Sequence, residues 1–320
     1  MKIAIAGLGK IGIAAEKAAR GVPDCEVVGL FSRREKYMLP KELSSRTYSF
    51  PEITNFKDRI DVVINCMGSA FDLPVTTPYL AKYFCVVDSF DNHSQFKEHI
   101  VKTDRFAKES GKLALVGCGW DPGLFSLLRA MFSSCMPFGK TYTFWGRGVS
   151  QGHSNAIKCI DGVADAVEYT VPIEEAREKI RSGETPHFEP GQMHKRVCYV
   201  VLEPGADHER IRNEIATMPS YFAPYDTQVN FIDYETFLCD HSAHMHEGSV
   251  LSSEKSNGET NVGEFKLKMT SNPAFTAQIL LSYARAVYKM NREGQSGCIT
   301  VFDVPPSKLF GKTSDELSLI

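Results

Sequence analysis

The apolar residues of the N-terminal third of the chain gather into short runs that alternate with longer helix-like segments. The runs at 2–6, 25–31, 60–66, 83–88 and 112–118 are rich in Val, Ile, Leu and Cys, and we expect them to form strands. The intervening stretches 13–19, 78–82 and 93–110 have a helical pattern. Strands that alternate with helices predict an α/β fold with a doubly wound parallel sheet.

From about residue 123 the pattern changes. A helix is expected over 123–133, and aromatic and β-branched runs at 142–145, 196–202 and 228–232 indicate a mixed second sheet. Two further helices are expected at 174–182 and 207–218, and the polar stretch 246–262 is typical of a loop or turn-rich connection. A last helix, 273–292, is expected to return to the first domain.

A glycine-rich turn joins the first strand to the first helix. It carries Gly7, Gly9 and Gly12 in the spacing G-x-G-x-x-G, with Leu8, Lys10 and Ile11 between them. The first glycine allows the tight turn, the second lets backbone approach a pyrophosphate, and the third lets the helix pack close to the strand. The free N–H groups of the helix then face the anion. This context predicts a Rossmann-type dinucleotide-binding domain.

The second strand ends in Ser32, Arg33 and Arg34, where an NAD-binding chain usually carries an acidic residue for the ribose hydroxyls. Two guanidinium groups and a hydroxyl suit a 2′-phosphate instead. The alternative is a solvated basic turn before Glu35 and Lys36, which is less expected at this spacing. The sequence therefore predicts NADP.

Composition narrows the class of protein. The 320 residues are 43% hydrophobic and 23% charged, with a net charge of −3, which gives no reason to expect a nucleic-acid partner. The sequence has no uninterrupted run of about twenty apolar residues, so a membrane span is not expected. Nine cysteines without C-x-x-C spacing favour a reduced cytoplasm. We expect two domains: a dinucleotide-binding domain at 1–122, completed by 273–320, and an α+β substrate-binding and dimerisation domain at 123–272.

Ligands of a doubly wound sheet bind beyond the carboxyl ends of its strands. The residues there include Gly68 and Ser69, the segment 89–91, and the segment 119–122. Asp91 and Asp121 are expected to converge on one pocket, where two carboxylates suit an ammonium group or general-base chemistry. Asp88 and Asn92, in contrast, are expected to be helix caps.

The second domain offers fewer chemical motifs. The glycine-rich run 145–154 is typical of a ligand-binding loop, with a flexible turn as the alternative, and its His153 is expected to lie on the surface or cap a helix. Arg196 is suited to bind a carboxylate bidentately. The cluster His241, His244, His246 and Glu247 lacks H-E-x-x-H spacing, so no metal site is predicted.

Beyond these motifs the chain resembles the meso-diaminopimelate dehydrogenase family over nearly its whole length. The segments that carry the resemblance are 31–34, 66–70, 87–93, 119–123, 144–146, 150–154, 194–196, 206–211, 229–233 and 294–297. Generic dinucleotide-binding enzymes share only the first glycines. The resemblance implies NADP-dependent oxidative deamination at the D-centre of meso-2,6-diaminopimelate. It implies that the reverse reaction, reductive amination with ammonia, supplies diaminopimelate for lysine and cell-wall synthesis. It also implies a homodimer.

The resemblance also implies roles for individual residues. Those implied to line NADP, with the glycine-rich turn, are Leu8 to Ile11, Ser32, Arg33, Arg34, Cys66, Met67, Gly68, Ser69, Ser89, Phe90, Asp91, Cys118, Gly119, Trp120, Asp121 and Pro122. Those implied to face the substrate are Asp91, Asp121, Trp145, Gln151, Gly152, Thr170, Arg196, His246 and Asn272. The match is less close around 241–248, so His241 or His244 could replace His246.

The implied substrate carries an ammonium and a carboxylate at each end. Asp91 and Asp121 would bind the reacting D-end amine, while Arg196 with Thr170, His246 and Asn272 would hold the distal L-end. Hydride loss requires a neutral amine, so a base must first remove a proton, and Asp121 is the expected base. Two alternatives remain: a broad-specificity NADP-dependent D-amino acid dehydrogenase of the same fold, and a catalytically silent NADP-binding regulator.

Overall fold

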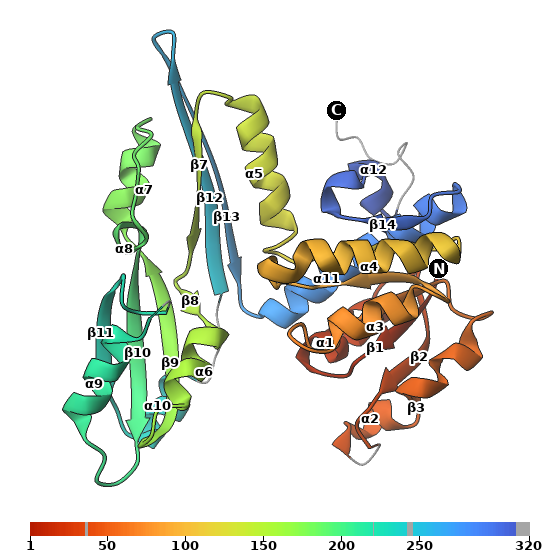
Figure 1. The fold of residues 1–320 in the computed structure, drawn as a ribbon, viewed down its shortest axis with the longest axis horizontal. Helices are drawn as coiled ribbons and strands as arrows, with labels where there is room; N and C mark the ends of the chain where they lie inside the picture. The colour runs from red at the N-terminus through yellow and green to blue at the C-terminus, as the bar shows by residue number, and fades with distance from the viewer. Residues whose placement is uncertain (36–37, 220, 242–245, 312–320) are drawn as a thin grey trace. The chain divides into compact units, whose positions relative to one another are not determined.

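The computed structural model describes residues 1–35, 38–219, 221–241 and 246–311. Its chain divides into two compact units (Figure 1). Unit 1 comprises Met1–Leu127 and Pro273–Ile320, and unit 2 comprises Leu128–Asn272.

Unit 1 is built on a seven-stranded parallel sheet. Its strands are β1 (Lys2–Ala6), β2 (Glu26–Ser32), β3 (Thr47–Ser49), β4 (Val62–Asn65), β5 (Cys85–Asp88), β6 (Leu113–Leu115) and β14 (Gly297–Ile299), in the spatial order β14-β6-β5-β4-β1-β2-β3. Its helices are α1 (Lys10–Arg20), α2 (Lys41–Ser44), α3 (Leu73–Leu80), α4 (Phe96–Glu109), α11 (Asn272–Arg292), α12 (Pro306–Leu309) and the first residues of α5 (Leu124–Cys135), with short 3₁₀ turns at 50–56, 93–95 and 301–303.

Both faces of this sheet are covered, as the alternation of side chains along each strand requires. Ile3 and Ile5 of β1 point into a core completed by α1 and α11. Ala4 and Ala6 of the same strand point into a second core with side chains from α3 and α4. The predicted doubly wound parallel sheet is therefore confirmed.

Unit 2 contains two smaller sheets. The mixed sheet has the order β11-β10-β9-β8, formed by β8 (Gly148–Val149), β9 (Val163–Pro172), β10 (His194–Leu202) and β11 (Asp226–Phe231). The antiparallel sheet has the order β13-β12-β7, formed by β7 (Lys140–Trp145), β12 (His246–Ser256) and β13 (Glu259–Met269). The helices of unit 2 include α6 (Gln151–Lys158), α7 (Glu174–Arg181), α8 (Pro190–Met193), α9 (His208–Thr217) and α10 (Tyr234–His241).

The helices of unit 2 bury the two faces of the mixed sheet. Ile157 of α6 and Ile211 and Ile215 of α9 pack with Cys198 and Val200 of β10. On the other face, Phe237 of α10 packs with Val149, Val167 and Val201. The mixed second sheet predicted from the sequence is confirmed by this arrangement.

The prediction of a loop over 246–262 is wrong. These residues form β12, the turn, and the start of β13, with Asn257 and Gly258 at positive φ in the hairpin turn. Ser249, Ser252 and Ser253 are fully buried in the central strand, and Ser253 satisfies its hydroxyl by donating to the Glu184 carbonyl. Buried serines gave the stretch a polar composition that concealed a strand.

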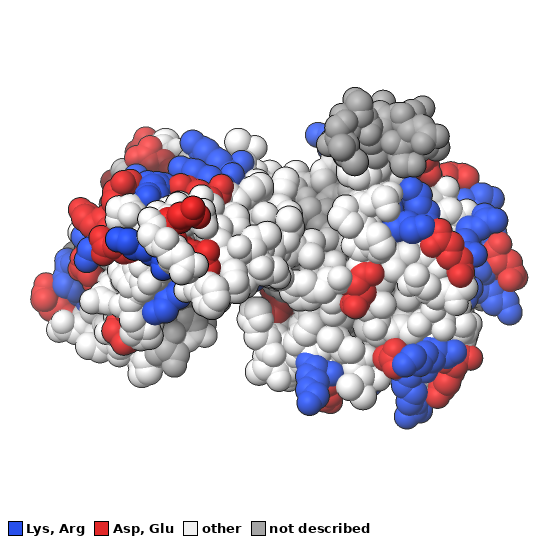
Figure 2. All heavy atoms as spheres, turned by 90° about the horizontal axis from the view of Figure 1, so that it is seen from above, with Lys and Arg blue, Asp and Glu red and all other residues white. Residues whose placement is uncertain are grey.

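The surface of both units mixes charges of the two signs. Acidic and basic side chains lie next to one another on the face shown in Figure 2. Among the described residues, no helix is both long and apolar enough to cross a membrane.

Candidate functional site

The glycine-rich turn between β1 and α1 packs against the strand-end loop that follows β4. A Cβ on Gly7, whose φ is +91°, would lie 2.9 Å from the Cys66 carbonyl carbon, and one on Gly12 would lie 1.9 Å from the Gly7 oxygen. Gly9 differs, since a Cβ there would meet nothing within 4 Å. Gly7 and Gly12 are therefore required by the fold, whereas Gly9 leaves open space for a ligand.

The N-terminus of α1 begins at this open position. Gly9 is its N-cap, no side chain caps the helix, and no acidic residue lies in the first turn. The free N–H groups of an eleven-residue helix consequently face the space beside Gly9 with no competing carboxylate. This cradle fits the pyrophosphate of a dinucleotide.

The end of β2 places Ser32, Arg33 and Arg34 together. Ser32 is buried, and its Oγ accepts the Arg34 N–H at 2.9 Å. The Arg33 guanidinium is 60% exposed and contacts Asp72 Oδ2 at 2.6 Å from its Nη2. Asp72 also accepts the Gly68 N–H at 3.1 Å, so it joins the loop after β2 to the loop after β4. Sequence reasoning missed Asp72, because nothing local to it indicates a distant arginine.

The loops after β4 and β5 are joined through Ser69 and Asp91. The Ser69 hydroxyl donates to the Asp91 carboxylate and accepts the Asp91 N–H at 3.1 Å. Asp91 is thus held at the carboxyl edge of the sheet, as its position after β5 predicts.

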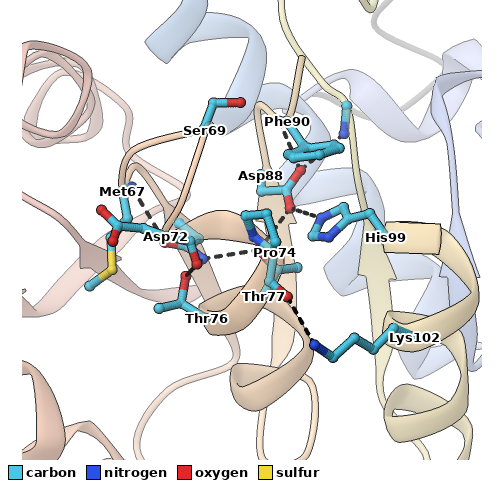
Figure 3. Close-up of polar contacts among 12 residues, drawn as sticks. Met67, Ser69, Asp72, Pro74, Thr76, Thr77, Asp88, Phe90, His99 and Lys102 are labelled. Carbon is cyan, nitrogen blue, oxygen red and sulfur yellow. Dashed lines mark hydrogen bonds and ion pairs between the residues drawn. The ribbon is translucent and has the colours of Figure 1, made fainter. Parts of the chain in front are cut away.

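Asp88, the last residue of β5, is the centre of a buried network (Figure 3). Its Oδ1 accepts the N–H groups of Phe90 at 3.1 Å and Gly117 at 3.0 Å. Its Oδ2 accepts the Thr77 hydroxyl at 2.7 Å and lies 2.8 Å from His99 Nε2. The prediction that Asp88 caps a helix is wrong, because its carboxylate is taken up by Phe90, Gly117, Thr77 and His99, and the N-cap residues that follow are Asn92 and Gln95. Asn92 does cap the following turn, through the Ser94 N–H.

The loop that carries Asp121 is a tight turn between β6 and α5. The Gly119 carbonyl accepts the Leu124 N–H at 2.9 Å, and the Trp120 carbonyl accepts the Phe125 N–H at 2.8 Å. Val87 of β5 pairs with Leu115 of β6, so the Asp91 and Asp121 loops follow neighbouring strands.

Burial raises the pKa of the Cys66 thiol to about 12 and that of Cys118 well above its usual value, so neither thiol is available as a nucleophile.

Arg196 of β10 lies opposite Thr170 of β9 in unit 2 and is largely buried. Its Nη1 donates to the Thr170 hydroxyl and lies 3.5 Å from Oε1 of Glu168, and its Cζ stands 4.0 Å from the centre of the Tyr225 ring. Its Nε is buried without a partner among the described residues. A guanidinium held in this way still has donors for a carboxylate.

Glu168 is completely buried beside this guanidinium. Thr170 Oγ1 donates to its Oε1 at 3.1 Å. Burial raises the pKa of the Glu168 carboxyl to about 7, although Arg196 and Thr170 favour its ionised form. Sequence reasoning missed Glu168, since its partner Arg196 is 28 positions away.

Trp145 ends β7, and the residue is 45% exposed. The backbone N–H of Trp145 donates to His194 Nε2 at 3.0 Å, and the two rings stack with centroids 5.8 Å apart. His194 is a further residue that the sequence did not single out. Its pKa is lowered to about 4 by burial and by Arg196, so its ring accepts from Trp145 as the neutral form.

The histidines separate into different environments. His153 is half-buried, its Nδ1 is hydrogen-bonded to the hydroxyl of Ser150, the N-cap residue of α6, its ring lies 5.5 Å from that of Phe222, and burial lowers its pKa to about 4. His241 Nδ1 lies 2.9 Å from the Tyr169 hydroxyl, and its ring stacks on Tyr199. His246 begins β12, and His244 falls outside the described residues.

The other predicted substrate residues are placed by the elements that contain them. Gln151 begins α6, Gly152 follows with open space around the position of a Cβ, and Asn272 begins α11. Asp91 and Asp121 belong to unit 1, and the remaining predicted substrate residues belong to unit 2.

Comparisons with known proteins agree over the full chain. A family model described as the diaminopimelic acid dehydrogenase C-terminal domain matches residues 119–271. A meso-diaminopimelate D-dehydrogenase from Acetivibrio thermocellus is 47% identical over 321 residues, which cover 99% of this chain and 96% of the relative.

Two similar solved structures contain bound ligands of their own. A mutant meso-diaminopimelate dehydrogenase from Clostridium tetani, crystallised with DAP, is 42% identical with a TM-score of 0.94, covering 100% of this chain and 99% of that one. An engineered D-amino acid dehydrogenase bound to NADP+ is 39% identical with a TM-score of 0.85, covering 99% and 98%.

Proposed function

The chain belongs to the meso-diaminopimelate dehydrogenase family, and from this we propose that it oxidatively deaminates the D-centre of meso-2,6-diaminopimelate with NADP+. The products are L-2-amino-6-oxopimelate, which cyclises to tetrahydrodipicolinate, together with ammonia and NADPH. The reverse reaction supplies diaminopimelate for lysine biosynthesis. The observation that carries the proposal is the full-length identity of 47% to a curated enzyme of this name.

The residues of unit 1 fit the cofactor. The space beside Gly9 and the uncapped N-terminus of α1 suit the pyrophosphate. Arg33 and Arg34, with the Ser32 hydroxyl, would bind the 2′-phosphate, and Arg33 would share its guanidinium between that phosphate and Asp72. When bound, NADP+ supplies the hydride acceptor. The segments 66–69, 89–91 and 118–122 would line the rest of the cofactor site.

The substrate is held at both ends in this proposal. Asp91 and Asp121 bind the D-end ammonium, and Arg196, with Thr170, His246 and Asn272, binds the L-end. The guanidinium of Arg196 supports this role, because among the described residues only its Nη1 has a hydrogen-bond partner and further donors are left for a carboxylate. Trp145, Gln151 and Gly152 would contact the remainder of the substrate. Fixing the distal end selects which hydrogen leaves.

The residues near the D-centre prepare it for reaction. We propose that Asp121 removes a proton from the ammonium, directly or through water, so that the nitrogen lone pair can assist departure of the hydride. Asp91, held by Ser69, keeps its carboxylate on the same nitrogen. Water then attacks the resulting iminium carbon, and ammonia leaves.

We also propose that residues 1–122, together with residues 273–320, form the dinucleotide-binding domain, and that residues 123–272 form the substrate-binding and dimerisation domain.

The protein is a cytoplasmic homodimer in this proposal. Exposed apolar side chains of unit 2, including Met131 and Phe138, support self-association. Nine free cysteines support a reducing compartment. Light scattering coupled to gel filtration tests the dimer, and a monomer at micromolar concentration contradicts it.

The test of function is reduction of NADP+, followed at the nicotinamide absorbance with meso-, LL- and DD-diaminopimelate. Turnover of the meso isomer with NADP+, and little with NAD+, is expected. The likeness to the engineered D-amino acid dehydrogenase favours a second candidate, a broad-specificity D-amino acid dehydrogenase. Comparable turnover of D-alanine would establish that alternative, and NADP binding without any turnover would establish a regulator.

A further inference from the structure

The carboxylate of Glu168 lies behind the guanidinium that the proposed function assigns to the substrate's distal carboxylate. Arg196 Nη1 lies 3.5 Å from Glu168 Oε1, and the Thr170 hydroxyl accepts from Arg196 and donates to Glu168. Glu168 is fully buried and Arg196 is 7% exposed, so water screens their interaction weakly. The charge that Arg196 presents to a ligand therefore depends on whether Glu168 carries a proton.

We propose that Glu168 is a proton-dependent positioning residue that sets how strongly Arg196 binds the distal carboxylate. With Glu168 protonated, Arg196 offers a full positive charge to the substrate. With Glu168 ionised, the pair is neutral, and a second carboxylate beside it is repelled by the first. The inference rests on the proposed function, because it takes the distal carboxylate of diaminopimelate as the ligand of Arg196.

The other titratable groups near Glu168 and Arg196 do not change their charge near pH 7, so the proton on Glu168 alone sets the charge of the pair. Its neighbours come from β9 and β10, with Thr170 and Cys198, and from α6, with Ser154. Two histidines, His153 of α6 and His194 of β10, lie near Arg196. The Ser154 hydroxyl accepts the Glu168 N–H at 2.9 Å and carries no charge. Burial lowers the pKa of His153 to about 4 and raises that of Cys198, so both are neutral at pH 7.

Burial also brings the pH at which Glu168 gains or loses its proton into the physiological pH range. It raises the pKa of Glu168 to about 7, so the free enzyme holds both protonation states near neutrality. A substrate carboxylate on Arg196 makes the negative charge on Glu168 less favourable still. Binding of substrate must then be accompanied by proton uptake above pH 7, by reciprocity of the two equilibria.

The experiment is calorimetric titration of meso-diaminopimelate into the enzyme saturated with NADPH, which cannot accept a hydride. Titrations at pH 6.5 to 8.5, in buffers of different ionisation enthalpy, give both Kd and the protons taken up. For the wild type, Kd should rise by up to about tenfold per pH unit above pH 7, with uptake approaching one proton per site.

The variant E168Q keeps an oxygen for the Thr170 hydroxyl but cannot titrate. Its Kd should stay flat between pH 6.5 and 8.5, and it should take up no proton beyond that of the matched control. That control is E254Q, which removes a buried carboxylate of β12 whose Oε1 accepts the Phe138 N–H at 2.8 Å. E254Q should keep the wild-type proton uptake.

The outcomes separate this inference from the proposed function. If neither wild type nor E254Q binds meso-diaminopimelate, the proposed function fails. If both bind it and E168Q takes up as many protons as the wild type, the role of Glu168 is overturned. D-alanine, which has no distal carboxylate, should show no E168Q-dependent proton uptake, and uptake with D-alanine would also contradict the proposal.

Discussion

His99 Nε2 lies 2.8 Å from Asp88 Oδ2, and both side chains are buried at the carboxyl edge of the unit 1 sheet (Figure 3). The His99 ring also packs on Phe90, with centroids 4.3 Å apart. Through the N–H groups of Phe90 and Gly117, the same carboxylate joins the loops that lead to Asp91 and Asp121. Two loops with proposed catalytic residues are thus fixed by one side chain that touches no solvent.

Replacing Asp88 should therefore impair catalysis through the loops. In D88N, one oxygen still accepts the backbone N–H groups, but an amide NH2 now faces Thr77 and His99. We expect kcat for meso-diaminopimelate at saturating NADP+ to fall by about tenfold or more, since small misplacement of reacting groups is costly. Steady-state kinetics measures it.

The control for D88N is D104N. Asp104 accepts the Cys298 N–H at 2.9 Å and pairs with Lys108, away from both loops. D104N keeps an amide oxygen for the Cys298 N–H and loses only the charge that pairs with Lys108, so kcat should stay within about twofold of the wild-type value. Equal kcat values for D88N and the wild type, with both variants folded, would contradict the positioning role of Asp88.

Gly9 and Gly12 of the turn before α1 should respond differently to substitution by alanine. G12A forces a Cβ to within 1.9 Å of the Gly7 oxygen, so it should lower the melting temperature and abolish NADP binding together. G9A meets no protein atom within 4 Å, so it should fold normally and lose NADP affinity alone. Thermal melts with and without NADP+ distinguish the two. An unchanged Kd in G9A would show that the pyrophosphate does not approach this turn.

Much of unit 1 could be predicted because its evidence is local. The G-x-G-x-x-G spacing and the alternation of apolar strands with helices each lie within a few residues. The roles of Asp88 and Glu168 could not be predicted in the same way. Each depends on a partner from another element, His99 or Arg196, and sequence proximity favours the more common reading of Asp88 as a helix cap.

Strand β12 shows a second reason why part of the fold could not be predicted from the sequence. Residues 248–254 are buried on both faces of a central strand, although three of them are serines and one is Glu254. Hydrophobic alternation predicts strands with one solvent-exposed face, and it cannot detect a strand such as β12, in which Ser252, Ser253 and Glu254 are buried and bonded to neighbouring backbone. The Asn257-Gly258 turn was the available indication of a hairpin.

The double variant R33A/R34A should reverse the coenzyme preference. Loss of both guanidinium groups removes the proposed partners of the 2′-phosphate, so Kd for NADP+ should rise by roughly 10- to 100-fold. Kd for NAD+, which lacks that phosphate, should change less than threefold. Fluorescence titration of both coenzymes gives the ratio, with R105A, at an exposed position of α4, as the control. A parallel loss of both coenzymes would indicate damage to the fold instead.

Arg196→Ala should separate two-ended from simple substrates. Removing the guanidinium leaves the distal carboxylate without a charged partner, which should cost roughly 2–5 kcal/mol in kcat/KM for meso-diaminopimelate. Any residual activity toward D-alanine should be little affected, because that substrate has no distal end. Loss of less than tenfold for meso-diaminopimelate would contradict the assignment of Arg196.

Glu168 should also make the stability of the protein depend on pH. Its pKa of about 7 in the folded state exceeds the ordinary value of 4.5, so the folded chain binds the proton more tightly than the unfolded chain. For this group, the free energy of unfolding should therefore fall by about 3–4 kcal/mol as pH rises from 4.5 to 7, and it should stay level above that range. E168Q removes the contribution, so urea unfolding at pH 5 and pH 8 should show a smaller decrease in E168Q than in the wild type. Identical decreases would mean that Glu168 stays ionised across this range, and with it the proposed coupling to the distal carboxylate would lose its physical basis.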